Sequence, residues 1–414
     1  MKRLIFAAVL LALLLTACGG ETVPPPPEEP DVPEASAPKT PEPPPEPEPK
    51  TPEELEEEAL QALLEGMTLE EKAGQLFFVK VPIENALEDV TTYHLGGYLL
   101  FGKDVRDRTA NELIQTIASW QTQAVDYDTG VPLLIGVDEE GGVVSRVSLN
   151  PHIRSEKFSG PQRLLKRGEG ELTFVKEQTR EKSVLLKALG FNVNLNPVAD
   201  VSTNPADFMY DRTTGGDESA AAAYVWAVLD VQTRCGLGSV MKHFPGYGNN
   251  RDTHNGAAVD QRPLDTFWNQ DFVPFQSGID FGRRNPLGPA VLVSHNIVNC
   301  MDSELPASLS PEVHRILRED LGFDGVVMTD DLDMGAVKSY AAEGNAAVLS
   351  LQAGNDLVVT TDYRTQIPRV IQAVKDGELL EKTLDAACLR VLRWKLELGL
   401  LELTGEGKLV SAVL

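Results

Sequence analysis

The chain has 414 residues, and its 62 acidic and 37 basic side chains give a formal net charge of −25. No basic stripe stands out that would neutralise phosphates, which argues against nucleic acid as a partner. The four cysteines lack zinc-binding spacing, and free thiols are expected for those that are not lipidated.

The N-terminal residues predict export. Lys2 and Arg3 precede an apolar run over residues 4–15, which ends in Leu-Thr-Ala-Cys at Cys18. This pattern describes a secretory signal over residues 1–17, and the run is too short to span a bilayer comfortably. Leu-Thr-Ala-Cys resembles a bacterial lipobox, which implies diacylation of Cys18; ordinary cleavage beside an incidental cysteine is the alternative. The resemblance predicts an extracytoplasmic protein that contacts the bacterial membrane only through its lipid.

Residues 18–52 are predicted to form an unfolded tether. From Glu21 to Thr51 the chain is dominated by Pro, Glu and Ala, with too few large apolar side chains to offset the ordering entropy. The prolines extend such a segment as a semi-rigid coil. Between Glu21 and Glu58 there are 13 acidic residues against two lysines, so this region contributes part of the net charge.

Residues 53–414 are predicted to fold as one domain. Eight apolar runs are expected to be strands buried on both faces: Leu76–Val81, Gly97–Phe101, Pro132–Asp138, Phe191–Val198, Gly238–Phe244, Ala290–Ile297, Gly325–Thr329 and Asp356–Thr360. Segments of helical periodicity alternate with them, including Ala110–Val125, Glu171–Leu189, Glu218–Cys235, Pro311–Leu321 and Ala336–Leu351. This order predicts an α/β fold, a (β/α)8 TIM barrel with a single catalytic domain. A doubly wound open sheet is the alternative, but no G-x-G-x-x-G follows the first strand.

Ionisable side chains stand at the ends of five predicted strands. They are Asp138, Asp200, the pair Lys242-His243, His295 and the pair Asp330-Asp331. The active site of a (β/α)8 barrel forms at the carboxyl ends of its strands. A single residue of this kind is ordinarily a cap or an ion pair, but five at matching positions predict a site. Asp331 and Asp333 lack neighbours with ligand-like spacing, so no metal is expected.

A loop rich in glycine and asparagine follows Lys242-His243 and contains Asp252-Thr253-His254. Its composition makes the backbone permissive, so the loop is able to move over the rim. Asp252 and His254 are spaced for a side-chain hydrogen bond. Such a carboxylate raises the basicity of the imidazole and gives a proton donor and acceptor near neutral pH. A local turn with an exposed histidine is the alternative.

Four motifs occur in order along the chain: Val-Asp-Glu-Glu-Gly-Gly followed by Arg146, then Asp-Arg-Thr, then Lys-His-Phe-Pro-Gly-x-Gly with Asp-x-His, then Thr-Asp-Asp-Leu-x-Met. Together they resemble glycoside hydrolase family 3, in its bacterial β-N-acetylglucosaminidase branch. The resemblance runs from about Met67 to Leu401 and includes the ending Lys-Leu-Glu-Leu-Gly-Leu-Leu.

The resemblance implies that Asp330 is the catalytic nucleophile, His254 the acid/base and Asp252 the partner that orients this histidine. It also implies a set of residues that bind the hydroxyls of the terminal sugar: Asp138, Arg146, Arg212, Lys242 and His243. The expected reaction is retaining hydrolysis of terminal non-reducing β-N-acetylglucosamine, through a covalent glycosyl–aspartate and without a cofactor. Peptidoglycan fragments or other glycans are the expected substrates.

Three positions depart from the family pattern. Val143 stands where arginine is common, Tyr247 replaces a histidine, and Thr-Thr-Gly-Gly follows Arg212 in place of Ser-Phe. None of these involves Asp330 or the Asp–His pair, so they bear on substrate detail. A β-N-acetylglucosaminide phosphorylase or a β-glucosidase on the same fold remains an alternative. A metal-dependent barrel hydrolase and a non-catalytic glycan-binding lipoprotein are further alternatives.

Overall fold

The computed structural model describes residues 24–25, 50–253, 256, 258–340 and 345–413. The predicted lipidation residue Cys18 and the predicted acid/base His254 lie outside the described residues. Cys235, Cys300 and Cys388 are free thiols.

Eight short strands form one parallel sheet in the order β10-β1-β2-β3-β4-β5-β7-β9. They are β1 (Phe77–Lys80), β2 (Gly97–Leu100), β3 (Leu134–Val137), β4 (Val193–Asn194), β5 (Gly238–Phe244), β7 (Ala290–Val293), β9 (Val327–Thr329) and β10 (Val358–Thr360). A parallel bridge between Met328 and Leu357 joins β9 to β10 and brings the two ends of the sheet together. Each strand lies inside one of the eight predicted runs, and the (β/α)8 barrel is confirmed.

Side chains fill the interior of the barrel, as the apolar strands require. Phe78 on β1 is fully buried and packs against β3 at Gly136. A Cβ atom at Gly136 would lie 2.3 Å from Cζ of Phe78, so the absent side chain makes room for the ring. Interiors packed to this density tolerate little added volume.

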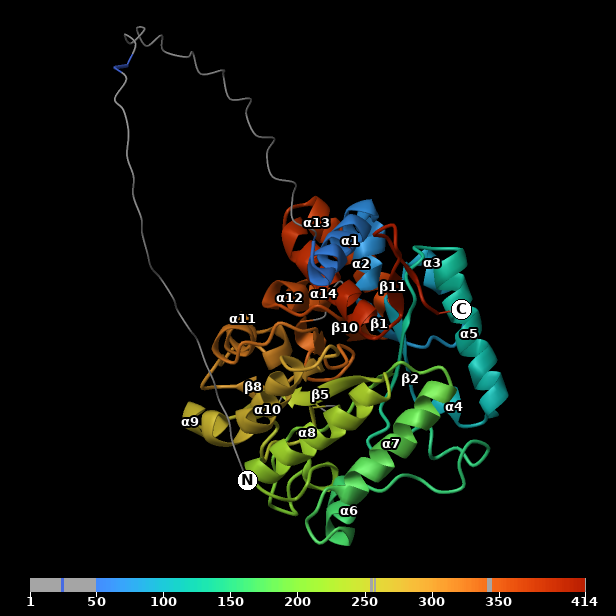
Figure 1. The fold of residues 1–414 in the computed structure, drawn as a ribbon. Helices are drawn as coiled ribbons and strands as arrows, with labels where there is room; N and C mark the ends of the chain where they lie inside the picture. The colour runs from blue at the N-terminus through green and yellow to red at the C-terminus, as the bar shows by residue number, and fades with distance from the viewer. Residues whose placement is uncertain (1–23, 26–49, 254–255, 257, 341–344, 414) are drawn as a thin grey trace, which may run out of the picture. The chain divides into compact units, whose positions relative to one another are not determined.

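Helices surround the sheet, and α7 and α8 run beside each other in Figure 1. The long helices are α1 (Pro52–Gly66), α5 (Ala110–Asp126), α7 (Thr173–Ala188), α8 (Glu218–Arg234), α10 (Phe272–Gly282), α12 (Asn345–Ala353), α13 (Tyr363–Lys375) and α14 (Glu381–Glu397). Helix α5 begins with a capping box, in which the Thr109 hydroxyl accepts from the Glu112 amide and the Glu112 carboxylate accepts from the Thr109 amide. This exchange satisfies two amides that have no partner within the helix.

The remaining elements are short. The helices are α2 (Leu69–Gln75), α3 (Glu88–Thr92), α4 (Gly102–Val105), α6 (Pro161–Arg167), α9 (Leu264–Thr266), α11 (Pro311–Arg315) and the 3-10 or π turns η1 (Tyr210–Arg212), η3 (Phe267–Asp271), η4 (Ala307–Leu309), η5 (Ile316–Asp320) and η6 (Lys338–Tyr340). The strands outside the barrel are β6 (Val259–Asp260) paired with β8 (Ile297–Val298), and β11 (Leu401–Leu403) paired with β12 (Leu409–Ser411).

One predicted helix, Ala336–Leu351, begins too early. The structure has a turn up to η6 and starts α12 at Asn345. Ala336 and Val337 are buried in this turn, so their apolar character reflects packing of the turn and not the face of a helix.

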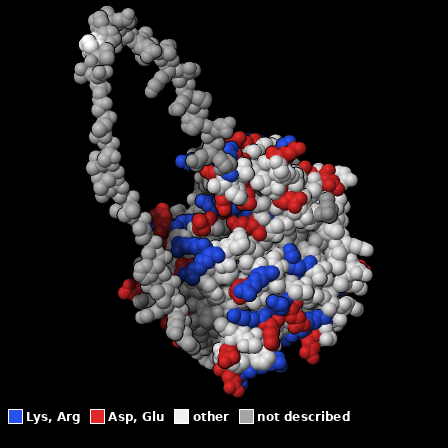
Figure 2. All heavy atoms as spheres, viewed as in Figure 1, with Lys and Arg blue, Asp and Glu red and all other residues white. Residues whose placement is uncertain are grey.

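Lys and Arg side chains lie among Asp and Glu side chains over the face seen in Figure 2. Among the described helices, none is long and apolar enough to cross a membrane.

Candidate active site

A cavity of about 430 Å³ opens at the carboxyl ends of the barrel strands. All of the predicted sugar-binding residues and the predicted nucleophile line it: Asp138, Arg146, Arg212, Lys242, His243 and Asp330. The structure therefore brings together side chains that are up to 192 positions apart in the chain (330 − 138).

Two cations and two carboxylates form a connected network at the cavity, and all of them except Glu140 line it. The Lys242 ammonium lies 2.5 Å from Asp138 Oδ1 and 2.7 Å from Glu140 Oε1. Arg212 donates to the same Glu140 carboxylate. Burial opposes the ionisation of Glu140, but the two cations hold its pKa well below the usual range. The network thus presents fixed hydrogen-bonding groups that need no reorganisation when a polar ligand enters.

The His243 ring lies between the carboxylate of Asp200 and the guanidinium of Arg212. Its Nδ1 is 2.7 Å from Asp200 Oδ2, and its Nε2 is 3.2 Å from Arg212 Nη2. Asp200 also accepts the main-chain amides of His243, at 3.1 Å, and of Tyr247, at 2.8 Å. The buried Asp200 carboxylate therefore fixes the ring of His243 and the turn that follows β5.

Asp330 follows directly after β9, and its amide donates to the Val293 carbonyl at the end of β7. Burial alone would raise the pKa of Asp330. His295 and His243, together with the hydrogen bond from the Asp331 amide, outweigh burial and hold this pKa below its ordinary value. Asp330 is consequently a carboxylate on a rigid strand end, charged at neutral pH and beside the cavity.

The loop after β3 positions Arg146. The Glu139 carboxylate accepts the amides of Arg146 and Val147, each at 2.7 Å, and the Ser148 hydroxyl at 2.5 Å. The Arg146 guanidinium lies 5.9 Å from the centre of the Phe101 ring, within the range of a cation–π contact. Glu139 is fully buried, so its role is to hold the loop.

The model of the glycosyl hydrolase family 3 N-terminal domain matches residues 68–394. The chain belongs to glycosyl hydrolase family 3. It is therefore a glycoside hydrolase, and the cavity at the strand ends is the place where a barrel enzyme binds its substrate.

This family 3 hydrolase is 33% identical to β-hexosaminidase LpqI of Mycobacterium tuberculosis over 339 residues, which cover 78% of this chain and 82% of the relative. A family 3 β-N-acetylglucosaminidase from Paenibacillus has a similar structure, with a TM-score of 0.73 and 27% identity over 80% of this chain and 63% of that one. A β-N-acetylhexosaminidase from Beutenbergia cavernae gives a TM-score of 0.70 and 28% identity over 79% and 98%.

The predicted acid/base pair is only partly described in this hydrolase. Asp252 is half-buried and is not among the residues that line the cavity. Thr253, the next residue, is fully buried, and its hydroxyl lies 2.5 Å from the Tyr247 hydroxyl. His254 lies outside the described residues, so the Asp252–His254 contact remains a prediction.

Several site residues were not singled out from the sequence. Glu140 and Glu139 belong to the Val-Asp-Glu-Glu-Gly-Gly motif, but only Asp138 of these acids received a role. Two acids directly after a buried strand, in a chain that places Lys242 and Arg212 on the same rim, are the signal that points to them. Lys80 at the end of β1 is a further case, since it pairs with Asp331 on the wall of the cavity. Burial raises the pKa of Asp331 to about 6 although Lys80 opposes the shift.

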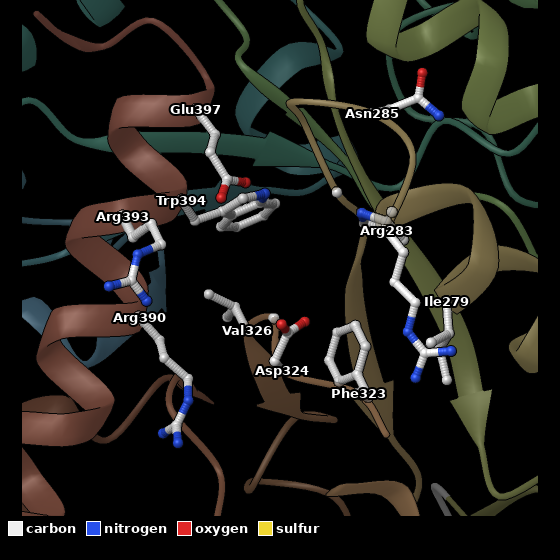
Figure 3. A pocket seen from close by; sticks show the side chains of 14 residues that line it. Ile279, Arg283, Asn285, Phe323, Asp324, Val326, Arg390, Arg393, Trp394 and Glu397 are labelled. Carbon is white, nitrogen blue, oxygen red and sulfur yellow. The ribbon is translucent and has the colours of Figure 1, made fainter. Parts of the chain in front are cut away.

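A second pocket, of about 200 Å³, lies at the opposite end of the barrel. Figure 3 shows Trp394 and Glu397 of α14 on one side of it and Phe323 and Asp324, which precede β9, on the other. None of the predicted site residues that the structure describes lines this pocket. Outside both pockets, a ring nitrogen of His94 and one carboxylate oxygen each of Glu71 and Asp128 lie within 4.8 Å of one another, close enough to share a metal ion.

Proposed function

We propose that the protein is a retaining, exo-acting β-N-acetylhexosaminidase that releases terminal non-reducing β-N-acetylglucosamine from glycans such as peptidoglycan fragments. One observation carries the proposal: a half-buried, ionised Asp330 stands beside a cavity lined by Asp138, Lys242 and Arg212. The names β-hexosaminidase and β-N-acetylglucosaminidase of the similar proteins support the choice of sugar.

In the proposed first step a carboxylate oxygen of Asp330 attacks the anomeric carbon. The bond between this carbon and the glycosidic oxygen breaks, and the oxygen leaves with a proton donated by the acid/base. In the second step a water attacks the anomeric carbon, its proton passes to the same acid/base, and Asp330 is released. Two inversions retain the β configuration. The low pKa of Asp330 supports a nucleophile that is ionised before the substrate arrives.

His254, oriented by Asp252, is the proposed acid/base. An imidazole with a pKa near neutral is able to donate a proton in the first step and accept one in the second. Its place in the loop after β5, whose described part is joined to the cavity wall through Tyr247, supports this role.

The cavity wall is proposed to bind the hydroxyls of the terminal sugar. Asp138 offers acceptors, whereas Arg146, Arg212 and Lys242 offer charged donors. Because the Asp138–Lys242–Glu140 contacts are already formed, the sugar meets an ordered surface and less binding energy is lost to ordering side chains.

The signal pattern and the Pro- and Glu-rich segment support an extracytoplasmic enzyme that is tethered to a bacterial membrane through a lipid on Cys18. Labelling cells with a radioactive or clickable fatty acid tests this proposal. Label is expected on the wild type and is expected to be absent from Cys18→Ser.

Release of 4-nitrophenol from its β-N-acetylglucosaminide and its β-glucoside tests the activity. The wild type is expected to prefer the first substrate, and Asp330→Ala and His254→Ala are expected to lose most of the activity on it. Equal rates on both glycosides would reject the N-acetyl assignment, and full activity of Asp330→Ala would reject the mechanism.

A further inference from the structure

Tyr247 occupies a fixed position beside the cavity. Its amide donates to Asp200, its ring meets the His243 ring edge to face at 5.3 Å between centroids, and it packs against Phe208 at 5.9 Å. The side chain is almost completely buried and lines the cavity together with Asp330. Burial and the charge of Asp330 raise the pKa of Tyr247, so the hydroxyl stays protonated. The direction of this hydroxyl is therefore set by packing on several sides.

The hydroxyl of Tyr247 contacts Thr253, which is fully buried although it lies in a polar loop. The neighbouring Arg251 is exposed and Asp252 is half-buried, so Thr253 is the point at which this part of the loop enters the protein. One peptide bond separates Thr253 from Asp252 on one side and from His254 on the other.

The two ends of the loop are held separately. Asn250 Nδ2 donates to the Tyr247 carbonyl at 2.8 Å and to Asp260 Oδ2 at 2.7 Å. Arg262 donates to Asp260 and to Asp271, whose carboxylate leaves no room for a side chain at Gly246. These contacts fix the base of the loop, and the Tyr247–Thr253 contact extends the fixation to its middle.

We propose that Tyr247 is a positioning residue which, through its hydroxyl contact with Thr253, fixes Thr253 and the adjoining Asp252, and that proton transfer from the proposed acid/base to the leaving oxygen depends on this fixation. This inference rests on the acid/base role proposed above. It assigns a function to a position where the chain departs from the family pattern. Misplacement of a proton donor by a fraction of an ångström slows the step that needs the proton and leaves sugar binding unchanged.

The test compares aryl β-N-acetylglucosaminides with phenol and with 2,4-dinitrophenol as leaving groups. The dinitrophenolate leaves without a proton. Tyr247→Phe and Thr253→Val are expected to lower kcat/KM, which reports the step that forms the glycosyl–aspartate, about tenfold on the phenyl glycoside and less than about twofold on the dinitrophenyl glycoside. Thr253→Ser keeps the hydroxyl and is expected to behave as the wild type. The double variant is expected to be no slower than either single variant, because both remove the same contact.

Tyr98→Phe is the matched control, since Tyr98 is a buried tyrosine whose hydroxyl donates to the Ala86 carbonyl at 2.6 Å and which does not line the cavity. It is expected to lower the melting temperature. Its effect on kcat/KM is expected to be the same for the phenyl and the dinitrophenyl glycoside. The inference would be overturned if Tyr247→Phe lost the same activity on both glycosides, or lost none on the phenyl glycoside, while the activity loss of His254→Ala did depend on the leaving group. If His254→Ala itself shows no such dependence, the acid/base role fails and the inference fails with it.

Discussion

Arg212 donates two hydrogen bonds to the buried carboxylate of Glu140, from Nε to Oε2 at 3.0 Å and from Nη2 to Oε1 at 2.7 Å. Lys242 adds a third contact to the same Oε1. Glu140 is thus the shared counter-ion of two cations that line the cavity, and the charge balance of the site depends on a residue that does not line it.

Glu140→Gln removes this counter-ion and leaves Arg212 and Lys242 with one buried negative charge fewer. Breaking a buried pair from one side is costly, so the free energy of unfolding is expected to fall by about 3 kcal/mol, with a loss of kcat/KM. Urea denaturation and kinetics measure the two effects. Glu312→Gln, which breaks a surface pair with Arg315, is the control and is expected to change stability by less than about 1 kcal/mol. If Glu140→Gln were as stable as Glu312→Gln, the assignment of Glu140 as the counter-ion of Arg212 and Lys242 would be contradicted.

Lys395 predicts a specific dependence of stability on pH. It is fully buried on α14, its ammonium donates to Gln75 Oε1 at 2.7 Å, and burial lowers its pKa to about 7. The unfolded chain therefore binds more protons than the folded one between about pH 7 and pH 10, and stability rises with pH across this window. Below pH 7 the full free-energy cost of burying the charged ammonium, about 5 kcal/mol, is present.

Lys395→Met removes the titrating group and keeps the length of the side chain. The difference in unfolding free energy between the wild type and this variant is expected to shift in favour of the wild type as the pH rises from 6 to 10. Denaturation at several pH values measures it. A difference that is independent of pH would show that Lys395 does not carry the shift.

The sequence was sufficient for the barrel and insufficient for the details of its loops. Strands such as β3 and β7 are buried on both faces. Every strand of a barrel has this environment, so each appears in the sequence as a continuous apolar run. The start of α12 was misplaced because Ala336 and Val337 are apolar for a tertiary reason, the packing of a turn. Strand ends also identified Asp138, Lys242 and Asp330, since topology alone brings them to one rim.

The contacts within the rim were beyond sequence reasoning. The partners of Glu139 and Glu140, the two acids that follow the predicted site residue Asp138, depend on the local turn after β3. The structure assigns Asp138 to the cavity, Glu139 to the loop amides and Glu140 to the cations. The partner of Tyr247 likewise depends on how the loop folds back, so its contact with Thr253 was not predictable.

Val143 tests the proposed substrate class. This exposed valine lines the cavity where the family pattern has arginine. Val143→Arg adds a cation at the rim, so KM is expected to fall several-fold for a disaccharide whose second sugar carries a carboxylate, as in muramic acid. The gain is expected to shrink in high salt and to be absent for a neutral aryl glycoside. Equal gains for both substrates would argue against a charged aglycone beside this position.

Trapping the covalent intermediate tests the central claim most directly. A fluorinated N-acetylglucosaminyl fluoride that reacts quickly and is released slowly is incubated with the enzyme, which is then digested and analysed by mass spectrometry. The proposed mechanism predicts one N-acetylglucosaminyl adduct, on Asp330. An adduct on the adjacent Asp331, or an active enzyme that forms no adduct, would contradict it.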